Sequence, residues 1–139
     1  MTSYFEILKE AFHSAPITKM VPQTMEIAGE GEVRITLHPD ERYHHGGGTV
    51  HGGVLGILLD NAGWFACATV SEGSWLATAE FKINLLEAVP AAQAVVAVGR
   101  VLRRGRHLMH GEMEATADGK KVAVGLGTYA VLPRKFKGL

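Results

Sequence analysis

The stretch HGGVLGILLDNAGWFACATV, residues 51–70, decides how the rest of the chain can fold. It is almost wholly apolar and is long enough for about five turns of α-helix at 3.6 residues each. The Gly-Gly pair near its start is typical of a loop that leads into a helix. Asp60 lies in the middle of the stretch and is the only carboxylate between Arg42 and Glu72. Because a buried, unpaired carboxylate is costly, Asp60 indicates a catalytic acid or base in a cleft.

A helical wheel gives this stretch one face for a core and one face around the acid. The residues opposite Asp60 form the apolar stripe of a core-facing helix; they are Leu55, Leu58, Ala62 and Phe65. The residues near Asp60 are Gly53, Gly56, Gly63, Trp64 and Cys67. The glycines at i−4 and i+3 predict open space beside the carboxylate.

Two other structures fit the same stretch: a turn in which Asp60 caps a second, shorter helix, and a membrane span. Asp at the centre of a span costs roughly 3 kcal/mol, and no cluster of Lys or Arg flanks this one. We therefore favour a buried helix in a globular domain.

Length and composition predict one domain over residues 1–139, large enough to bury a core. Fourteen Lys and Arg balance fourteen Asp and Glu, so no overall charge favours nucleic acid or a membrane as partner. A hydrophobic content of 47% and 17 glycines exclude disorder and favour a strand-rich fold. Cys67 is the single cysteine, and the N-terminus lacks the basic and apolar regions of a signal peptide. We therefore expect a reducing, cytoplasmic location.

The N-terminal part of the chain predicts a short helix and a hairpin. Over residues 3–14, Ser3 can cap an amphipathic helix with Glu6 three positions on, and Pro16 and Pro22 then predict extended chain. Residues 24–28 and 32–37 are strand-like and are joined by a glycine-rich turn. Residues 39–48 predict a loop that leads to the long helix.

The C-terminal half predicts four strands, over residues 78–85, 93–102, 107–116 and 121–132. The first alternates apolar and polar residues, whereas the second is nearly continuously apolar and predicts burial on both sides. Asp118-Gly119 is a strong hairpin signal, and Gly125 and Gly127 predict that a helix packs close to the sheet. The order favours an α+β fold in which an antiparallel sheet wraps the long helix. Strands that are apolar on both faces also predict burial against a second copy.

The residues from His44 to Asp60 resemble those of a known enzyme family. The motif Gly48-x-x-His51-Gly52-Gly53, with Asp60 nine positions after His51, is similar to that of the hotdog-fold acyl-CoA thioesterases of the PaaI-like, phenylacetate-degradation branch. The resemblance extends over residues 37–132. It implies a hotdog fold, in which about six antiparallel strands wrap one central helix and a short N-terminal helix is added. It also implies hydrolysis of an acyl-CoA to a free acid and coenzyme A.

The resemblance also implies roles for single residues. The backbone N–H of Gly52 matches the group that polarises the thioester carbonyl, Asp60 matches the nucleophile or general base, and Thr78 matches the residue that orients the water or the carboxylate. The family usually has Asn or Gln where this chain has His45. Three explanations of this departure stay open: His45 replaces the amide as a donor, His44 shifts into its place, or the site serves another substrate. His51, the histidine of the motif, completes the catalytic candidates.

The resemblance places the site between subunits and implies a homodimer that assembles further to a homotetramer. No cofactor is implied, because coenzyme A is part of the substrate, and no metal is required.

Two further sets of residues are candidates for substrate contacts. The basic turn with Arg103, Arg104 and Arg106 could bind the phosphates of coenzyme A, or could be a solvated hairpin. We also assign Gly53, Asn61 and Trp64 to the substrate pocket. Cys67 has no base placed beside it by the sequence, so we interpret it as a packing residue.

Three other functions stay open. His44, His45 and His51 lie close in sequence and could bind a metal, although no helix-spaced His pair is present. A hydratase or dehydratase acting on an acyl thioester could use His51 and Asp60 on the same fold. A non-catalytic acyl-CoA binding module would keep the pocket without turnover, and the change to His45 gives that alternative weight.

Overall fold

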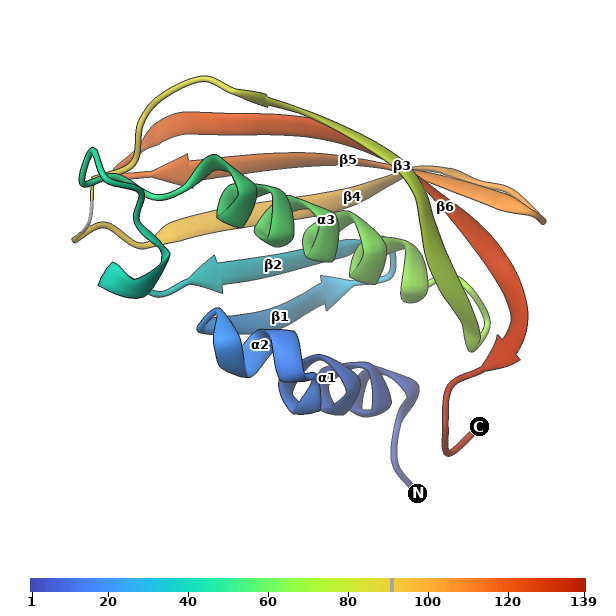
Figure 1. Cartoon of the computed structure of the whole chain (residues 1–139). Coiled ribbons are helices and arrows are strands. Elements are labelled where there is room, and N and C mark those ends of the chain that lie inside the picture. The colour runs from blue at the N-terminus through green and yellow to red at the C-terminus, as the bar shows by residue number, and fades with distance from the viewer. Residues whose placement is uncertain (91) are drawn as a thin grey trace.

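A six-stranded antiparallel sheet wraps around one long helix in the computed structural model, which describes residues 1–90 and 92–139 (Figure 1). The strand order is β1-β2-β4-β5-β6-β3, with every neighbouring pair antiparallel. The helical elements are α1 (Tyr4–Ser14), α2 (Pro16–Met20), the 3-10 helix η1 (Glu41–Tyr43) and α3 (Gly52–Ala68). The strands are β1 (Gln23–Gly29), β2 (Glu32–Leu37), β3 (Ser74–Leu85), β4 (Val95–Arg104), β5 (Leu108–Ala117) and β6 (Lys120–Lys135). The predicted α+β architecture is confirmed.

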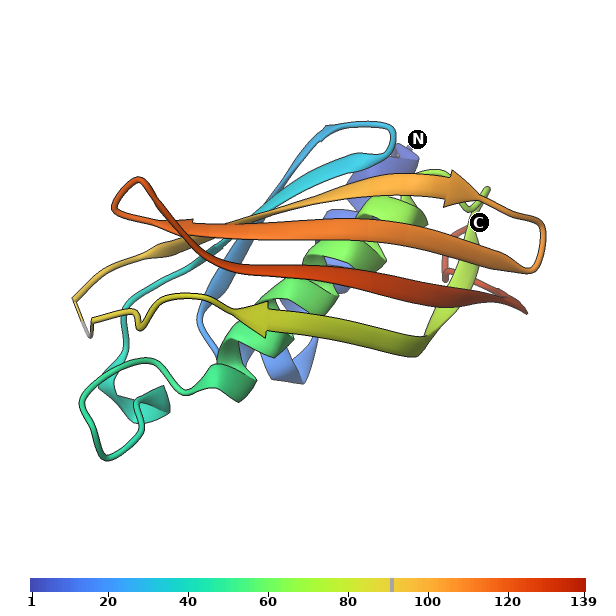
Figure 2. The same cartoon turned by 90° about the horizontal axis from the view of Figure 1, so that it is seen from above.

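The long helix α3 is the centre of the core. Its predicted core stripe is confirmed, since Leu55, Leu58, Ala62 and Phe65 are all buried. The helix has almost no polar face, because the sheet curves around it and leaves little of its surface in water (Figure 2). Within the described residues, no helix is both long enough and apolar enough to cross a membrane.

One glycine sets the distance between α3 and the sheet. A Cβ atom placed on Gly99 of β4 would lie 2.1 Å from the main-chain oxygen of Ala62 in α3, so only glycine fits there. The sequence pointed to Gly125 and Gly127 for this close approach, and that prediction is wrong. The Tyr129 hydroxyl group lies over Gly127, and a Cβ atom on Gly125 would meet the Lys82 main-chain oxygen of β3 and the Ile83 and Met113 side chains, so neither glycine makes room for the helix backbone.

The N-terminal segment forms two helices. The Ser3 side chain accepts from the Glu6 N–H and the Glu6 carboxylate accepts from the Ser3 N–H, as the sequence predicted. The extended chain predicted after Pro16 is wrong, because Pro16 opens the short helix α2. Proline suits a first helical position, where its missing N–H leaves no hydrogen bond unmade.

The predicted strands are confirmed with shifted ends, and one burial prediction fails. Asp118 and Gly119 both have positive φ in the tight turn between β5 and β6. Along β4, Val95, Ala97 and Gly99 are buried, but the alternate residues are only partly buried or exposed. The second face of β4 is therefore not buried within one chain, contrary to the prediction.

The two edges of the sheet differ. The helix α1 packs against β1 at one edge, whereas β3 ends the sheet at the other edge and pairs only with β6 in the part of the chain described (Figure 2). Phe81 and Leu85 of β3 are 41% and 51% exposed, although both are large apolar residues. An open, apolar edge strand is a surface on which a second chain can pair.

Candidate active site

Asp60 is held in the middle of α3 by two hydroxyl groups. The Thr78 hydroxyl on β3 donates to the Asp60 carboxylate over 3.0 Å, and the Tyr129 hydroxyl on β6 donates to the Asp60 main-chain oxygen over 3.4 Å. The carboxylate is partly buried, and this burial raises the pKa of Asp60 above its ordinary value of 3.8, while the hydrogen bond from Thr78 opposes the rise. A desolvated carboxylate with a raised pKa is a better base near neutral pH.

The glycines around Asp60 do not leave the open space that the sequence predicted. The position of a Cβ atom on Gly63 would overlap the Tyr129 hydroxyl, and Met113 lies beside it. Gly56 lies against Ile83 and Phe81 of β3. These glycines let the helix pack closely on neighbouring side chains, so the space beside Asp60 is narrower than predicted.

The N-terminus of α3 presents one free amide. His51 is the N-cap, and its Nδ1 accepts the N–H of Gly53 over 2.9 Å. The N–H of Gly52, the first residue of the helix, donates no hydrogen bond within the described residues. The Gly52 N–H lies at the positive end of the helix dipole, so it can stabilise a developing oxyanion. Gly53, a predicted pocket residue, already has its amide occupied.

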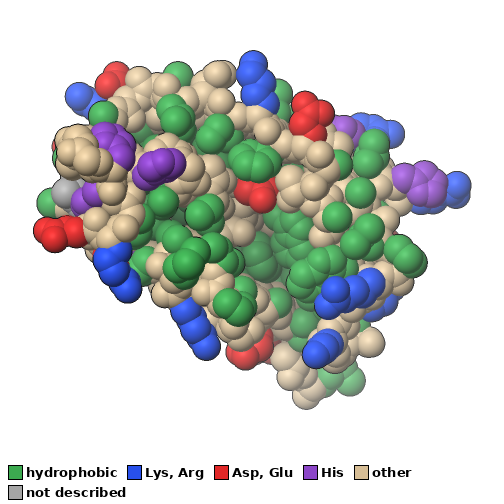
Figure 3. Space-filling model, viewed as in Figure 1, with side chains coloured by type: hydrophobic (Ala, Val, Ile, Leu, Met, Phe, Trp, Pro, Cys, Tyr) green, Lys and Arg blue, Asp and Glu red, His purple; other side chains and the backbone are tan. Residues whose placement is uncertain are grey.

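His45 lies close to this helix start. It lines a cavity of about 230 Å³ together with Thr49, Gly52 and apolar side chains of α3 and β3. Its Nδ1 accepts the N–H of Gly47 over 2.9 Å, and its Nε2 lies 2.6 Å from the Thr49 hydroxyl oxygen. Figure 3 shows histidine side chains (purple) at both ends of the molecule, so they do not form a single cluster. In the described part of the chain, no group of three or more potential metal ligands comes together.

The two ends of the proposed chemistry do not meet within one chain. Gly52 and Asp60 are eight residues apart on the same helix, which separates them by about 12 Å along its axis. A carbonyl oxygen bound at the amide and a water bound at the carboxylate must be only a few ångströms apart. One chain therefore carries both predicted groups but does not bring them together.

The predicted pocket residues on α3 have other partners. The Asn61 side chain donates to Gln23 of β1 over 3.2 Å and so is turned toward β1. The Trp64 ring N–H donates to the Leu76 main-chain oxygen over 3.0 Å. Trp64 also packs edge-on against Phe65, Trp75 and Phe136. Figure 3 shows apolar side chains spread over this face of the molecule.

The basic turn lies at the far end of α3 from Gly52. Arg104 forms an ion pair with Glu72, which follows the C-terminal end of the helix, and the Arg106 side chain lies 3.5 Å from His107. Arg103 and Arg104 are the last residues of β4 rather than part of the turn. A role of these arginines in binding coenzyme A phosphates stays a prediction.

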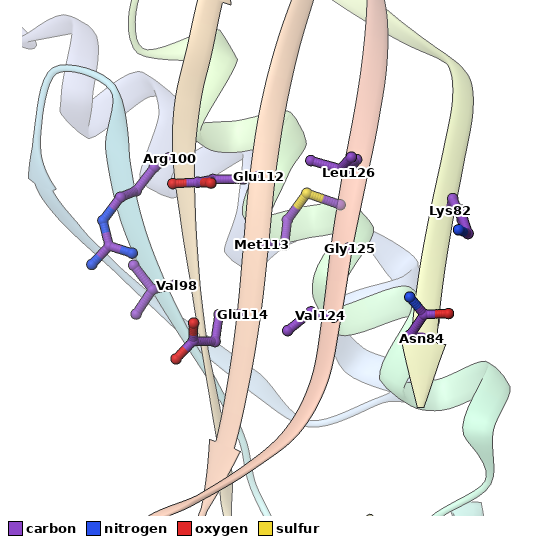
Figure 4. Close-up of a pocket in the computed structure, with 10 residues that line it drawn as sticks. All are labelled: Lys82, Asn84, Val98, Arg100, Glu112, Met113, Glu114, Val124, Gly125 and Leu126. Carbon is purple, nitrogen blue, oxygen red and sulfur yellow. The ribbon is translucent and has the colours of Figure 1, made fainter. Parts of the chain in front are cut away.

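A separate cavity of about 330 Å³ lies on the outer face of the sheet, where Figure 4 shows Arg100, Glu112 and Glu114 on neighbouring strands. None of the predicted site residues lines this cavity.

Two residues near the site were not identified from the sequence. Tyr129, which reaches Asp60 from β6, is one of several apolar or aromatic residues in a strand, and no local pattern marks it. Thr49 lies between the glycine run and His51, where its hydroxyl meets His45. The Tyr129 contact joins segments 69 residues apart, whereas the Thr49 contact is local and depends on how the loop from His45 to Thr49 turns.

The sequence profile of the Thioesterase superfamily matches residues 47–124, which include the helix start, Asp60 and Thr78. The chain belongs to the thioesterase superfamily. Among the relatives of this superfamily member is a Saccharolobus solfataricus protein named as an esterase, 32% identical over 78% of this chain and 77% of the relative. Human acyl-coenzyme A thioesterase 13 is 26% identical over 76% of each chain.

A solved structure supports the fold of this superfamily member. The E. coli PaaI protein from the phenylacetic acid degradation operon superposes with a TM-score of 0.87, covering 94% of each chain at 20% identity. At that identity the match shows the fold alone, and it confirms the predicted hotdog architecture.

Proposed function

We propose that this thioesterase-superfamily protein hydrolyses an acyl-CoA to a free acid and coenzyme A. One observation carries the proposal: helix α3 holds a partly buried carboxylate, Asp60, which accepts a hydrogen bond from the Thr78 hydroxyl of β3, and the first amide of the same helix, at Gly52, has no partner in the described chain. Superfamily membership and the name of the human relative support the substrate class.

In the proposed reaction, Asp60 acts as a general base. It takes a proton from a water molecule while the water oxygen bonds to the thioester carbonyl carbon. The carbonyl oxygen gains the negative charge and is stabilised by the Gly52 N–H at the positive end of α3. When the intermediate collapses, the C–S bond breaks and the leaving thiolate takes the proton from Asp60. A thiolate leaves readily, so the site needs an activated water and an oxyanion donor more than a strong acid.

The separation of Gly52 and Asp60 requires two chains. We propose a homodimer in which the open edge of β3 pairs with the same strand of a second copy, so that the helix start of one chain faces Asp60 of the other. The half-exposed Leu85 and the 41% exposed Phe81 on that edge supply apolar area for such an interface. Further assembly to a homotetramer is also part of the proposal.

The test is a panel of aromatic, short-chain and medium-chain acyl-CoA substrates, with release of coenzyme A followed by a thiol-detecting reagent. Asp60→Asn and Asp60→Ala should lower kcat by ~10²–10⁴-fold, the usual worth of a positioned base. Thr78→Ser is the matched control, because it keeps the hydroxyl that faces Asp60. A folded Asp60→Ala variant with unchanged turnover would exclude Asp60 as the base.

The same assay separates the alternative functions. An acyl-CoA binding module would bind the substrates tightly without releasing coenzyme A at any pH. A hydratase would add water to an enoyl-CoA without releasing a thiol. Either result would replace the hydrolase proposal.

A further inference from the structure

We propose that the Thr49 hydroxyl is the second donor to the thioester oxygen, beside the Gly52 N–H, and that His45 orients it. The inference rests on the proposed function and concerns the same site. It addresses the position at which this chain has His45 where the family that it resembles has Asn or Gln. An amide side chain at that position could donate a hydrogen bond directly, and the structure gives the corresponding imidazole a different arrangement.

The hydrogen bonds of His45 determine its proton position. The backbone N–H of Gly47 can only donate, and it points at Nδ1 of His45 over 2.9 Å. Nδ1 must therefore be the bare nitrogen of a neutral ring, and the proton is on Nε2. Nε2 lies 2.6 Å from the Thr49 hydroxyl oxygen, so the imidazole donates and the hydroxyl accepts.

Both ring nitrogens of His45 are thus in use, which leaves no group on the ring to donate to a substrate. The Thr49 hydroxyl, in contrast, accepts from His45 and still has its own proton. That proton has no acceptor among the described residues. A hydroxyl that accepts a hydrogen bond also becomes a better donor, because the two bonds polarise one another.

The Thr49 hydroxyl and the Gly52 N–H belong to residues that line one cavity, of about 230 Å³. Most of the other residues that line it are apolar, among them Leu55, Leu85 and Leu86, and Glu87 lines it too. A thioester carbonyl that entered with its carbon chain against the leucines would have the two donors at its polar end. Such a pair, one backbone N–H and one side-chain hydroxyl, forms an oxyanion hole.

The backbone around Thr49 is fixed independently of the hydroxyl. The Thr49 main-chain oxygen accepts from the His45 N–H over 3.0 Å, and Thr49 forms an antiparallel bridge with Pro90. Valine has the same shape as threonine at Cβ, so Thr49→Val removes the donor and leaves the fold. Loss of one preorganised oxyanion donor lowers kcat by ~10²-fold or more.

The experiment compares Thr49→Val, Thr49→Ser, His45→Ala and the Thr49→Val/His45→Ala double variant, with the wild-type protein and the acyl-CoA panel described above. We expect kcat to fall by ~10²-fold in Thr49→Val with KM little changed, and Thr49→Ser to keep most of the activity. In His45→Ala, kcat should fall by a smaller factor. The kcat of the double variant should be no lower than that of Thr49→Val, because His45 acts through Thr49. Melting temperatures report whether each variant is folded.

Two results would overturn the inference while the proposed function stands: an active wild type with Thr49→Val unchanged, or losses that multiply in the double variant. An inactive wild type, with every acyl-CoA intact, would overturn the proposed function itself and this inference with it. If Thr49→Val does not fold, the same question is answered by Thr49→Ser, whose activity must exceed that of Thr49→Ala.

Discussion

Gly99 offers the most direct test of how the fold positions the site. A Cβ atom at this residue of β4 would lie 2.1 Å from the Ala62 oxygen, 2.3 Å from the Ala62 carbonyl carbon and 2.9 Å from the Gly63 nitrogen. All three are backbone atoms of α3, so no side chain can turn aside to make room. In Gly99→Ala, α3 must therefore move away from the sheet by about 1 Å to restore an ordinary contact distance.

That movement has a cost in stability and a cost in activity. Overpacking of a tight core typically costs 1–3 kcal/mol, and a clash with rigid backbone belongs at the upper end, about 3 kcal/mol. For a chain of 139 residues this lowers the Tm by about 10 °C. Asp60 lies two residues from Ala62 on the displaced helix, and a misplacement of about 1 Å can lower a rate ~10²-fold.

Differential scanning calorimetry measures the change in Tm. The loss of activity is measured as turnover of the best acyl-CoA from the panel, corrected for the folded fraction. Gly29→Ala is the matched control, because a Cβ atom on that glycine of β1 meets nothing within 4 Å. The control should melt and turn over like the wild type. A Gly99→Ala protein with an unchanged Tm and unchanged turnover would refute the conclusion that Gly99 of β4 sets the distance between α3 and the sheet.

Two further predictions follow from the environments of Asp60 and Cys67. Asp60 must be ionised to act as a base, and burial raises its pKa, so kcat/KM of the wild type should fall as the pH falls through a value above 3.8. The Thr78→Val variant lacks a hydrogen bond to the ionised carboxylate, so its kcat/KM should begin to fall at a higher pH. The Thr78→Ser variant keeps the hydroxyl and should have the wild-type profile. A pH profile that is the same in all three proteins would contradict the role of Thr78. Burial raises the pKa of the Cys67 thiol to about 12, so Cys67 should not react with a thiol reagent at pH 8 until the protein is unfolded in guanidinium, and rapid labelling of the native protein would show that the helix opens.

The elements that the sequence predicted well are those determined by local patterns. The apolar stripe of α3, the Ser3 and Glu6 capping box and the Asp118-Gly119 turn each depend on residues within a few positions of one another. The prediction of extended chain after Pro16 is wrong for a related reason. A proline before a helix and a proline in extended chain look alike locally, and only the packing of α2 distinguishes them.

The wrong predictions concern tertiary contacts, that is, which residue packs against a given position. The sequence placed Gly125 and Gly127 on one strand face correctly, but it could not tell that Tyr129 and Met113 fill their space while Gly99 meets the helix. Likewise, the apolar run of β4 could not reveal that one of its faces is left partly exposed in a single chain. The contact of Gly99 with Ala62 joins residues 37 positions apart, and the side chain that fills the space over Gly127 depends on the rotamer of Tyr129, so no local period records either of them.

The site itself combines both kinds of information. The motif around His51 and the isolated acid at Asp60 are local, and they predict the two halves of the proposed chemistry from the sequence alone. Their eight-residue spacing on one helix is also local, and it places them about 12 Å apart. The sequence thus already contains the reason for proposing that two chains complete the site. The open edge of β3, with Phe81 and Leu85 exposed, adds the surface on which a second copy could bring the two halves together. Under this proposal, dimer formation and catalysis are one requirement, and a variant that leaves the chain monomeric and folded should lose turnover even though every residue named for the chemistry is present.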